Sequence, residues 1–191
     1  ATHRYHHIHS AEPEDPHTPL QGYGFNWAHM FWFLFHSPLE TNEFRTKYAP
    51  DLAKDPVHRA LSRYDWVGPW MLGILLFLWG GWSFVIWGIF LRTVITCHVT
   101  WCVNSATHLW GYKTHATKDN SRNLWWVGIL SFGEGWHNNH HAFQHSARHG
   151  LRWWEVDMTY LMIRTLGFFK LVHSIRLPKL PSLETHPAPA A

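Results

Sequence analysis

Two short histidine clusters, near the two ends of the chain, carry residue types and spacings that could do chemistry. Residues 3–7 and residues 137–141 both read H-x-x-H-H, and we call them the N-terminal box and the C-terminal box. On a helix, positions i, i+3 and i+4 lie on one face, so each box is predicted to present three imidazoles as one stripe. Two facing stripes would supply six neutral nitrogen ligands, which is more than one tetrahedral zinc ion takes, and imidazole also suits iron.

A third element lies between the boxes. Asn104 and His108 are four residues apart, so they share one face of a predicted helix. A lone histidine there would more often be an ordinary polar residue, but the two boxes favour His108 as a ligand, with Asn104 binding directly or through a water. Seven nitrogens suggest two divalent transition-metal ions, and two neighbouring irons could share the electrons needed to cleave O2. The candidate ligands are His3, His6, His7, His108, His137, His140 and His141.

The segment that must bring the boxes together is strongly apolar. Arg92 is the only charged residue between Trp66 and Tyr112, and Gly80-Gly81 is a natural break within this stretch. We therefore predict two helices, at about 66–79 and 82–103, that form a transmembrane hairpin in an all-α integral membrane protein. An even number of crossings is required, because both boxes must reach the same site. Arg92 would lie deep in the bilayer, where an unpaired charge is costly, and the sequence does not identify its partner.

Composition supports a membrane protein and excludes other classes. The chain has 14 tryptophans, and only 15% of its residues are charged, which is typical of lipid-facing or interfacial proteins. A net charge of +3 without a basic run argues against nucleic acid as a partner. Cys97 and Cys102 are interpreted as small buried apolar residues rather than as a disulfide or zinc site.

The remaining segments are expected to frame this site. We predict a proline-rich loop after the N-terminal box, in which His9 and His17 either support the ligands or are simply solvated. Residues 21–36 are predicted to form a helix in the membrane interface, with a buried core helix as the alternative. Further predictions are a polar connection with a short helix near 56–64, a return to the polar side over 113–136, an amphipathic helix over 155–172 and a disordered tail over 173–191.

Four motifs together resemble the membrane fatty-acid desaturases of the Δ9 type, over residues 1–172. The resemblance is greatest to the bacterial and cyanobacterial acyl-lipid members. The motifs are His3-Arg4-x-His6-His7, Asp15-Pro16-His17, Asn104-Ser105-Ala106-x-His108 and Gly133-Glu134-Gly135-Trp136-His137-Asn138-x-His140-His141. This resemblance implies four transmembrane helices and a cytosolic helical cap that holds two iron ions (Fe2+/Fe3+). It implies the seven histidines as iron ligands, Asn104 as a ligand through water, and Thr100 and Trp101 as walls of a bent acyl tunnel. Glu134 and His17 would support the imidazoles from outside.

The implied reaction introduces a cis double bond at Δ9 of a saturated acyl chain. It uses O2 and two electrons from a separate donor, either ferredoxin or cytochrome b5. Two departures from the family pattern matter. An earlier H-x-x-x-x-H box and two transmembrane helices are expected to lie outside this sequence, so this stretch is not expected to complete the site alone. An Arg-Lys pair of the acyl-CoA members is replaced by His36-Ser37, which favours a lipid-bound acyl chain over acyl-CoA.

Two other functions remain open. A related di-iron membrane enzyme could hydroxylate a lipid or a carotenoid at the same kind of site. A non-catalytic membrane metal or haem protein is the second alternative, although haem needs only one or two axial histidines and these histidines come as triplets.

Overall fold

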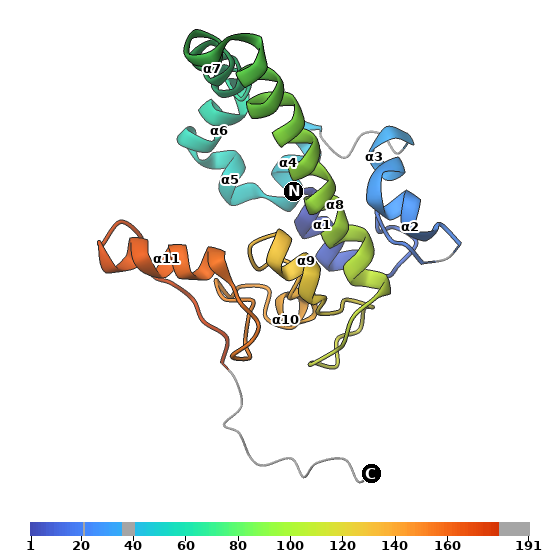
Figure 1. The fold of residues 1–191 in the computed structure, drawn as a ribbon. Coiled ribbons are helices and arrows are strands. Elements are labelled where there is room, and N and C mark those ends of the chain that lie inside the picture. Colours follow the sequence, from blue (N-terminus) through green and yellow to red (C-terminus); the bar gives the residue numbers. More distant parts are fainter. Residues whose placement is uncertain (21, 36–40, 180–191) are drawn as a thin grey trace.

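The computed structural model describes residues 1–20, 22–35 and 41–179, and Figure 1 shows their arrangement. Within these residues the regular structure is helical, with only two isolated β-bridges, so the predicted helical class is confirmed. An elongated helical limb carries the apolar residues at one end of the molecule, and the two boxes meet at the base of this limb (Figure 1). The predictions that concern His36-Ser37 and residues 180–191 lie outside the described residues.

The N-terminal box folds as α1 (Thr2–His9), and a prolyl loop follows it as predicted. The next helical segment consists of α2 (Gly24–Asn26), the π-helical turn η1 (Trp27–Phe31) and α3 (Trp32–Phe35). It packs against α8, described below, through the fully buried Ala28, whereas Leu34 and Phe35 remain exposed. One side of this segment is therefore covered by α8 and another is exposed. It is not the buried core helix that was the alternative prediction.

Three short helices form the polar connection to the apolar limb. They are α4 (Asn42–Tyr48), α5 (Pro50–Lys54) and α6 (Pro56–Arg63). The Asp55 carboxylate accepts a hydrogen bond from the Val57 amide at 2.7 Å, and Pro56 occupies the first helical position. This N-cap and proline explain why α6 begins where the sequence predicted a helix.

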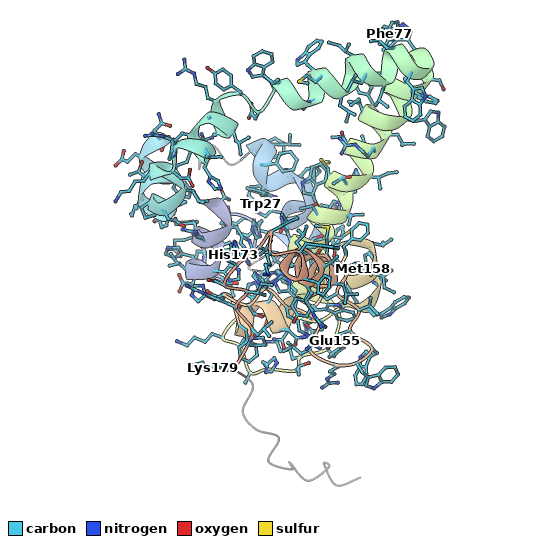
Figure 2. All side chains as sticks on the ribbon, turned by 90° about the vertical axis from the view of Figure 1, so that its left-hand side faces the viewer. Trp27, Phe77, Glu155, Met158, His173 and Lys179 are labelled. Atoms are coloured by element: carbon cyan, nitrogen blue, oxygen red, sulfur yellow. The ribbon has the colours of Figure 1, made fainter. Side chains whose placement is uncertain are left out.

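The apolar limb contains α7 (Val67–Val85), the π-helical turn η2 (Ile86–Leu91) and α8 (Arg92–Leu109). The segment Val67–Leu109 is long and apolar enough to cross a membrane. Helical geometry breaks at the predicted pair, because Gly81 has φ of +65° and ψ of −158°, a conformation essentially restricted to glycine. Beyond this point the chain folds back, and the Phe77 and Trp82 rings lie 5.2 Å apart. Figure 2 shows Phe77 near the tip of the limb.

The Arg92 guanidinium forms hydrogen bonds with neighbouring residues of the same helical limb. Its Nε donates a hydrogen bond to the Gly88 carbonyl oxygen at 3.0 Å, and its Nη2 donates to Thr93 Oγ1 at 3.3 Å. The backbone carbonyl one turn earlier is thus the partner that the sequence did not identify.

The C-terminal part contains α9 (Trp125–Leu130), which packs against α8, followed by α10 (His137–Ala142) and α11 (Met158–Phe168). Trp136 is almost fully buried, packs beside Gly128 and donates a hydrogen bond to the Val156 carbonyl at 2.8 Å. Gly135 is required here, because a Cβ atom on it would lie 2.0 Å from the Gly128 amide nitrogen. The small apolar core that supports α10 comprises Ala106, Leu124 and Val127.

The amphipathic helix predicted over 155–172 is shorter in the structure. Asp157 caps α11 by accepting a hydrogen bond from the Tyr160 amide at 2.8 Å, so the helix begins at Met158. Residues 173–179, the described part of the predicted tail, have no helix, but the Arg176 carbonyl accepts a hydrogen bond from the Ala147 amide at 2.8 Å. This contact holds the segment against the loop that follows α10.

Candidate metal centre

All seven predicted histidine ligands converge in the structure, and they form two clusters. In the first, the Nε2 atom of His7 lies 2.9 Å from that of His140 and 3.1 Å from that of His3. We call this the outer cluster, because His3 is exposed and His7 is half-buried. The second we call the inner cluster, because its four members are all buried. They are His6, His108, His137 and His141.

The clusters do not follow the two boxes, which corrects the expectation of one stripe for each box. The outer cluster takes the i and i+4 histidines of the N-terminal box and the i+3 histidine, His140, of the C-terminal box. The inner cluster takes the i and i+4 histidines of the C-terminal box, the i+3 histidine, His6, of the N-terminal box, and His108. Consecutive helical residues are separated by about 100° around the axis, so positions i+3 and i+4 point in clearly different directions. Each box therefore serves both clusters.

Two buried carboxylates orient histidines of the inner cluster. Asp15 Oδ1 lies 3.0 Å from His6 Nδ1, and Asp119 Oδ2 lies 2.5 Å from His141 Nδ1. A carboxylate accepts, so each Nδ1 carries the proton and each Nε2 presents its lone pair to the cluster. The Nε2 atom of His6 is buried and has no hydrogen-bond partner. An inward-facing lone pair without a donor is what a metal ligand requires, so these residues fit a metal ion.

The separations between imidazole nitrogens fit the same interpretation. Two nitrogens bound at about 2.1 Å to one ion would lie about 3.0 Å apart at a right angle and about 3.4 Å apart at a tetrahedral angle. His141 Nε2 and His137 Nε2 are 3.0 Å apart, and His108 Nε2 and His137 Nε2 are 3.1 Å apart. These separations are compatible with imidazole nitrogens that share one metal ion.

Burial favours the neutral form of several of these imidazoles. Burial and then the neighbouring histidines lower the pKa of His6 and of His137 well below the usual histidine value. Burial also lowers the pKa of His7 to about 3. Burial alone would raise the pKa of Asp119, but its hydrogen bonds with His141 and Ser121 outweigh burial and lower it. Burial raises the pKa of Asp15, whereas Asp119 is ionised at neutral pH.

The two asparagines inside the C-terminal box hold α10 in place. The Asn138 side-chain oxygen accepts hydrogen bonds from the Thr114 and His115 amides at 2.7 and 2.8 Å. Asn139 Nδ2 donates to Glu155 Oε2 at 2.8 Å, and Asn139 Oδ1 accepts from Asn123 Nδ2 at 2.9 Å. These contacts leave the three histidines of the box free to point toward the clusters.

The other predicted residues of α8 lie outside the histidine clusters. Asn104 is half-buried one turn before His108. The exposed Thr100 donates its hydroxyl hydrogen to the Thr96 carbonyl at 2.9 Å. Trp101 packs against Phe33 of α3, with ring centroids 5.0 Å apart.

The predicted supporting residues differ in their relation to the site. His17 is buried beside His6, with ring centroids 4.2 Å apart. Glu134 lies 3.5 Å from His149 Nδ1, and it is the His149 ring that lies against His140, at 4.5 Å between centroids. His9 bonds to Glu12 at the surface.

Sequence reasoning did not select the two carboxylates that contact box histidines. Asp15 was available in the Asp15-Pro16-His17 motif, where its acidity could have marked it as a histidine partner. Asp119 sits in a polar loop without any periodic pattern, and its role follows only from the packing of that loop on α10.

Comparison with known proteins gives a consistent result. The family model for fatty acid desaturases matches residues 1–172. The chain is 50% identical over 176 residues to the sn-1 stearoyl-lipid 9-desaturase of Anabaena variabilis, covering 92% of this chain and 63% of that protein. It is 48% identical to the enzyme of the same name from Synechocystis, covering 92% of this chain and 54% of that protein.

A less similar relative is named for a different substrate. The chain is 40% identical over 178 residues to the acyl-CoA C20 Δ5-desaturase of Anemone leveillei, covering 93% of this chain and 56% of that protein. The chain thus spans between about half and two thirds of the length of these relatives.

Proposed function

Because the chain belongs to the fatty acid desaturase family, we propose that it holds the metal centre of an O2-dependent acyl desaturase that forms a cis double bond at Δ9. The observation that carries this proposal is the pairing of two histidine clusters built reciprocally from the two boxes. The relatives named as 9-desaturases of stearoyl-lipid support the position of the double bond and a lipid-bound substrate.

The two clusters would each hold one iron ion. His3, His7 and His140 are the ligands proposed for the outer ion, and the four histidines of the inner cluster are those proposed for the inner ion. Asn104, one turn before His108, would contribute through a water. When bound, the iron pair supplies the activation of O2. Asp15 and Asp119 keep the His6 and His141 protons on Nδ1, so that the opposite nitrogen is available as a ligand. His17 and, through His149, Glu134 are proposed to support the rings from outside.

The apolar limb would cross the membrane twice, as a hairpin within a multi-pass protein whose histidine centre lies on the cytosolic side. The reversal at Gly80-Gly81 and the exposed apolar surfaces of both halves of the limb support this arrangement. Lipid would cover these surfaces, because exposing an apolar area of this size to water is unfavourable.

The acyl chain would lie along Thr100 and Trp101. Trp101 of α8 and Phe33 of α3 supply an aromatic wall, and Trp101 lies close in sequence to Asn104 and His108. Such a wall would exclude water and set which carbon faces the metal centre. The proposed substrate is an acyl lipid, with acyl-CoA as the alternative that the Anemone relative's name suggests.

The reaction must balance in electrons. O2 accepts four electrons: two come with the two hydrogens removed from neighbouring carbons, and two come from a separate donor protein, ferredoxin or cytochrome b5. With two further protons, O2 becomes two molecules of water. The chain's histidines are proposed to hold the centre, and the tunnel residues to orient the substrate.

The decisive experiment is lipid analysis of a host that lacks its own desaturase and expresses the full-length gene. We expect acyl chains that have lost two hydrogens, with the new double bond at Δ9 in intact glycerolipids. Acyl chains that have gained one oxygen would instead identify a hydroxylase. Unchanged lipids, despite iron-loaded protein in the membrane, would overturn the assignment as an enzyme of acyl chains.

A further inference from the structure

A group of cationic side chains converges around the segment Gly111–Lys113, just beyond the end of α8. Arg122 Nη1 donates a hydrogen bond to the Gly111 carbonyl at 3.2 Å, and Arg152 lies over the Tyr112 ring at 5.5 Å from its centroid. Lys113 Nζ donates to the Asp119 carbonyl at 2.5 Å. We call this the basic surface. Its members are Lys113, Arg122 and Arg152, together with the exposed Lys118, which precedes Asp119 in the sequence.

The carboxylates that border the basic surface are buried and already bound. Asp119 is 9% exposed and bonds to His141 and Ser121. Glu155 is 3% exposed and accepts hydrogen bonds from the Tyr112 hydroxyl, the Asn139 amide group and two backbone amides. Lys113, Lys118 and Arg152, in contrast, are exposed. The surface therefore presents positive charge to the solvent.

An exposed aromatic side chain lies next to a member of the basic surface. Trp153, next to Arg152, is 89% exposed, and Arg152 lies over the Trp154 ring at 5.1 Å from its centroid. Exposed tryptophan and arginine are the residues that most often dominate the binding energy of protein–protein interfaces. This combination is unlike the lysine-rich, tryptophan-poor surface of an ordinary solvated loop.

The position of the surface argues for a soluble partner rather than for lipid. Figure 2 shows Glu155, whose carboxylate binds Tyr112, at the end of the molecule opposite to Phe77 at the tip of the apolar limb. A bilayer that receives the limb therefore lies away from the basic surface, which faces water.

Two short bonded paths connect the basic surface to the C-terminal box. Lys113 binds the backbone of Asp119, and the Asp119 carboxylate binds His141 of the inner cluster. The Tyr112 hydroxyl donates to Glu155 at 2.7 Å, and Glu155 binds Asn139 of the box at 2.8 Å. The first path reaches the ligand His141 through Lys113 and Asp119, and the second reaches Asn139, the neighbour of His140, through Tyr112 and Glu155.

We propose that the basic surface is the docking site of the electron donor, and that this donor is a small, acidic, one-electron carrier protein. The proposal rests on the proposed function, which requires two electrons per turnover from outside the chain. Two successive one-electron carriers, each oxidised once, supply them to the metal centre. Complementary charge would steer the carrier to this surface, and Trp153 would anchor it.

The test uses the iron-loaded full-length protein in liposomes and a reduced plant-type ferredoxin, a strongly acidic carrier, as the probe. The variants Arg152→Glu and Lys118→Glu reverse charge on the basic surface. Arg59→Glu and Arg63→Glu on α6 reverse equal charges elsewhere and serve as controls. Ferredoxin binding is measured directly at several salt concentrations, and desaturation is measured with ferredoxin and with a small chemical reductant.

We expect the basic-surface variants to weaken ferredoxin binding and to raise its KM at least tenfold, with a smaller dependence on salt than the unaltered protein shows. Their turnover with the chemical reductant should be unchanged, which also shows that they fold and load iron. Equal effects of the α6 variants, or unaltered binding in the basic-surface variants, would overturn the docking site. Absence of desaturation with either reductant in the unaltered protein would instead overturn the proposed function.

Discussion

His7 and His140 are separated by 133 residues of sequence, yet their Nε2 atoms lie 2.9 Å apart in the outer cluster. His6, the neighbour of His7, turns to the inner cluster instead. Each cluster is therefore assembled from both boxes, and under the proposed function removing one histidine should affect one iron position selectively.

We predict that His140→Ala abolishes desaturation and loses the iron of the outer cluster, while membrane insertion and the inner iron remain. His140 contributes to the outer cluster alone, so the inner ligands stay intact. Iron analysis and Mössbauer spectroscopy of purified protein measure the two sites. His145→Ala is the matched control, because His145 is exposed and outside both clusters. Normal unsaturated-lipid output from the His140 variant would contradict the ligand assignment.

Asp15→Asn is expected to weaken iron retention by the inner cluster about 10-fold, the lower end of the range for supporting partners of metal ligands. The amide preserves the shape of Asp15 but removes the charge that holds the His6 proton on Nδ1. Competition with a chelator, followed by iron analysis, measures retention.

Glu12→Gln is a stringent control for Asp15→Asn, because Glu12 also binds a histidine, His9, at 2.8 Å. His9 belongs to neither iron cluster as proposed, so its partner should not matter for the iron. Equal losses in the two variants would show that Asp15 has no specific part in metal binding.

Gly135→Ala should destabilise the C-terminal half of the protein by about 1–3 kcal/mol, the usual cost of overpacking. The new Cβ would meet the backbone of Gly128 at 2.0 Å, and α9 would have to move away from the segment that leads into α10. Thermal unfolding in detergent measures the effect. Gly68→Ala, whose Cβ would meet nothing within 4 Å, should leave the melting temperature nearly unchanged. A similar melting temperature for both variants would refute the close packing of α9 on Gly135.

The hairpin predicts how single cysteines react with a membrane-impermeant thiol reagent, in a background where Cys97 and Cys102 are replaced by alanine. His58→Cys and Lys118→Cys should be labelled from the same side of the membrane. Trp82→Cys, next to the reversal at Gly81, should be accessible only from the other side. Labelling of residues 58 and 118 from opposite sides would mean a single crossing.

The sequence predicted what depends on local pattern and residue chemistry. Box spacing identified six of the histidines, and the shared helix face of Asn104 and His108 pointed to the seventh. Gly80-Gly81 marked the reversal, because only glycine accepts the φ and ψ found at Gly81. The partition into inner and outer clusters was not predictable in the same way, since it depends on how α1 and α10 face each other. The role of Asp119 likewise requires the folded loop, because 22 residues separate it from His141. The length of α11 was misjudged because the cap at Asp157 was not recognised.

The two copies of H-x-x-H-H also differ in a way that their identical spacing conceals. In α10 the spacers Asn138 and Asn139 are buried and bonded on every side, so all five positions of that box are occupied by structural or ligand contacts. In α1 the spacer Arg4 lies at the surface and pairs with Asp51. Random mutagenesis should therefore find the position of Arg4 open to many residue types and the positions of Asn138 and Asn139 almost closed.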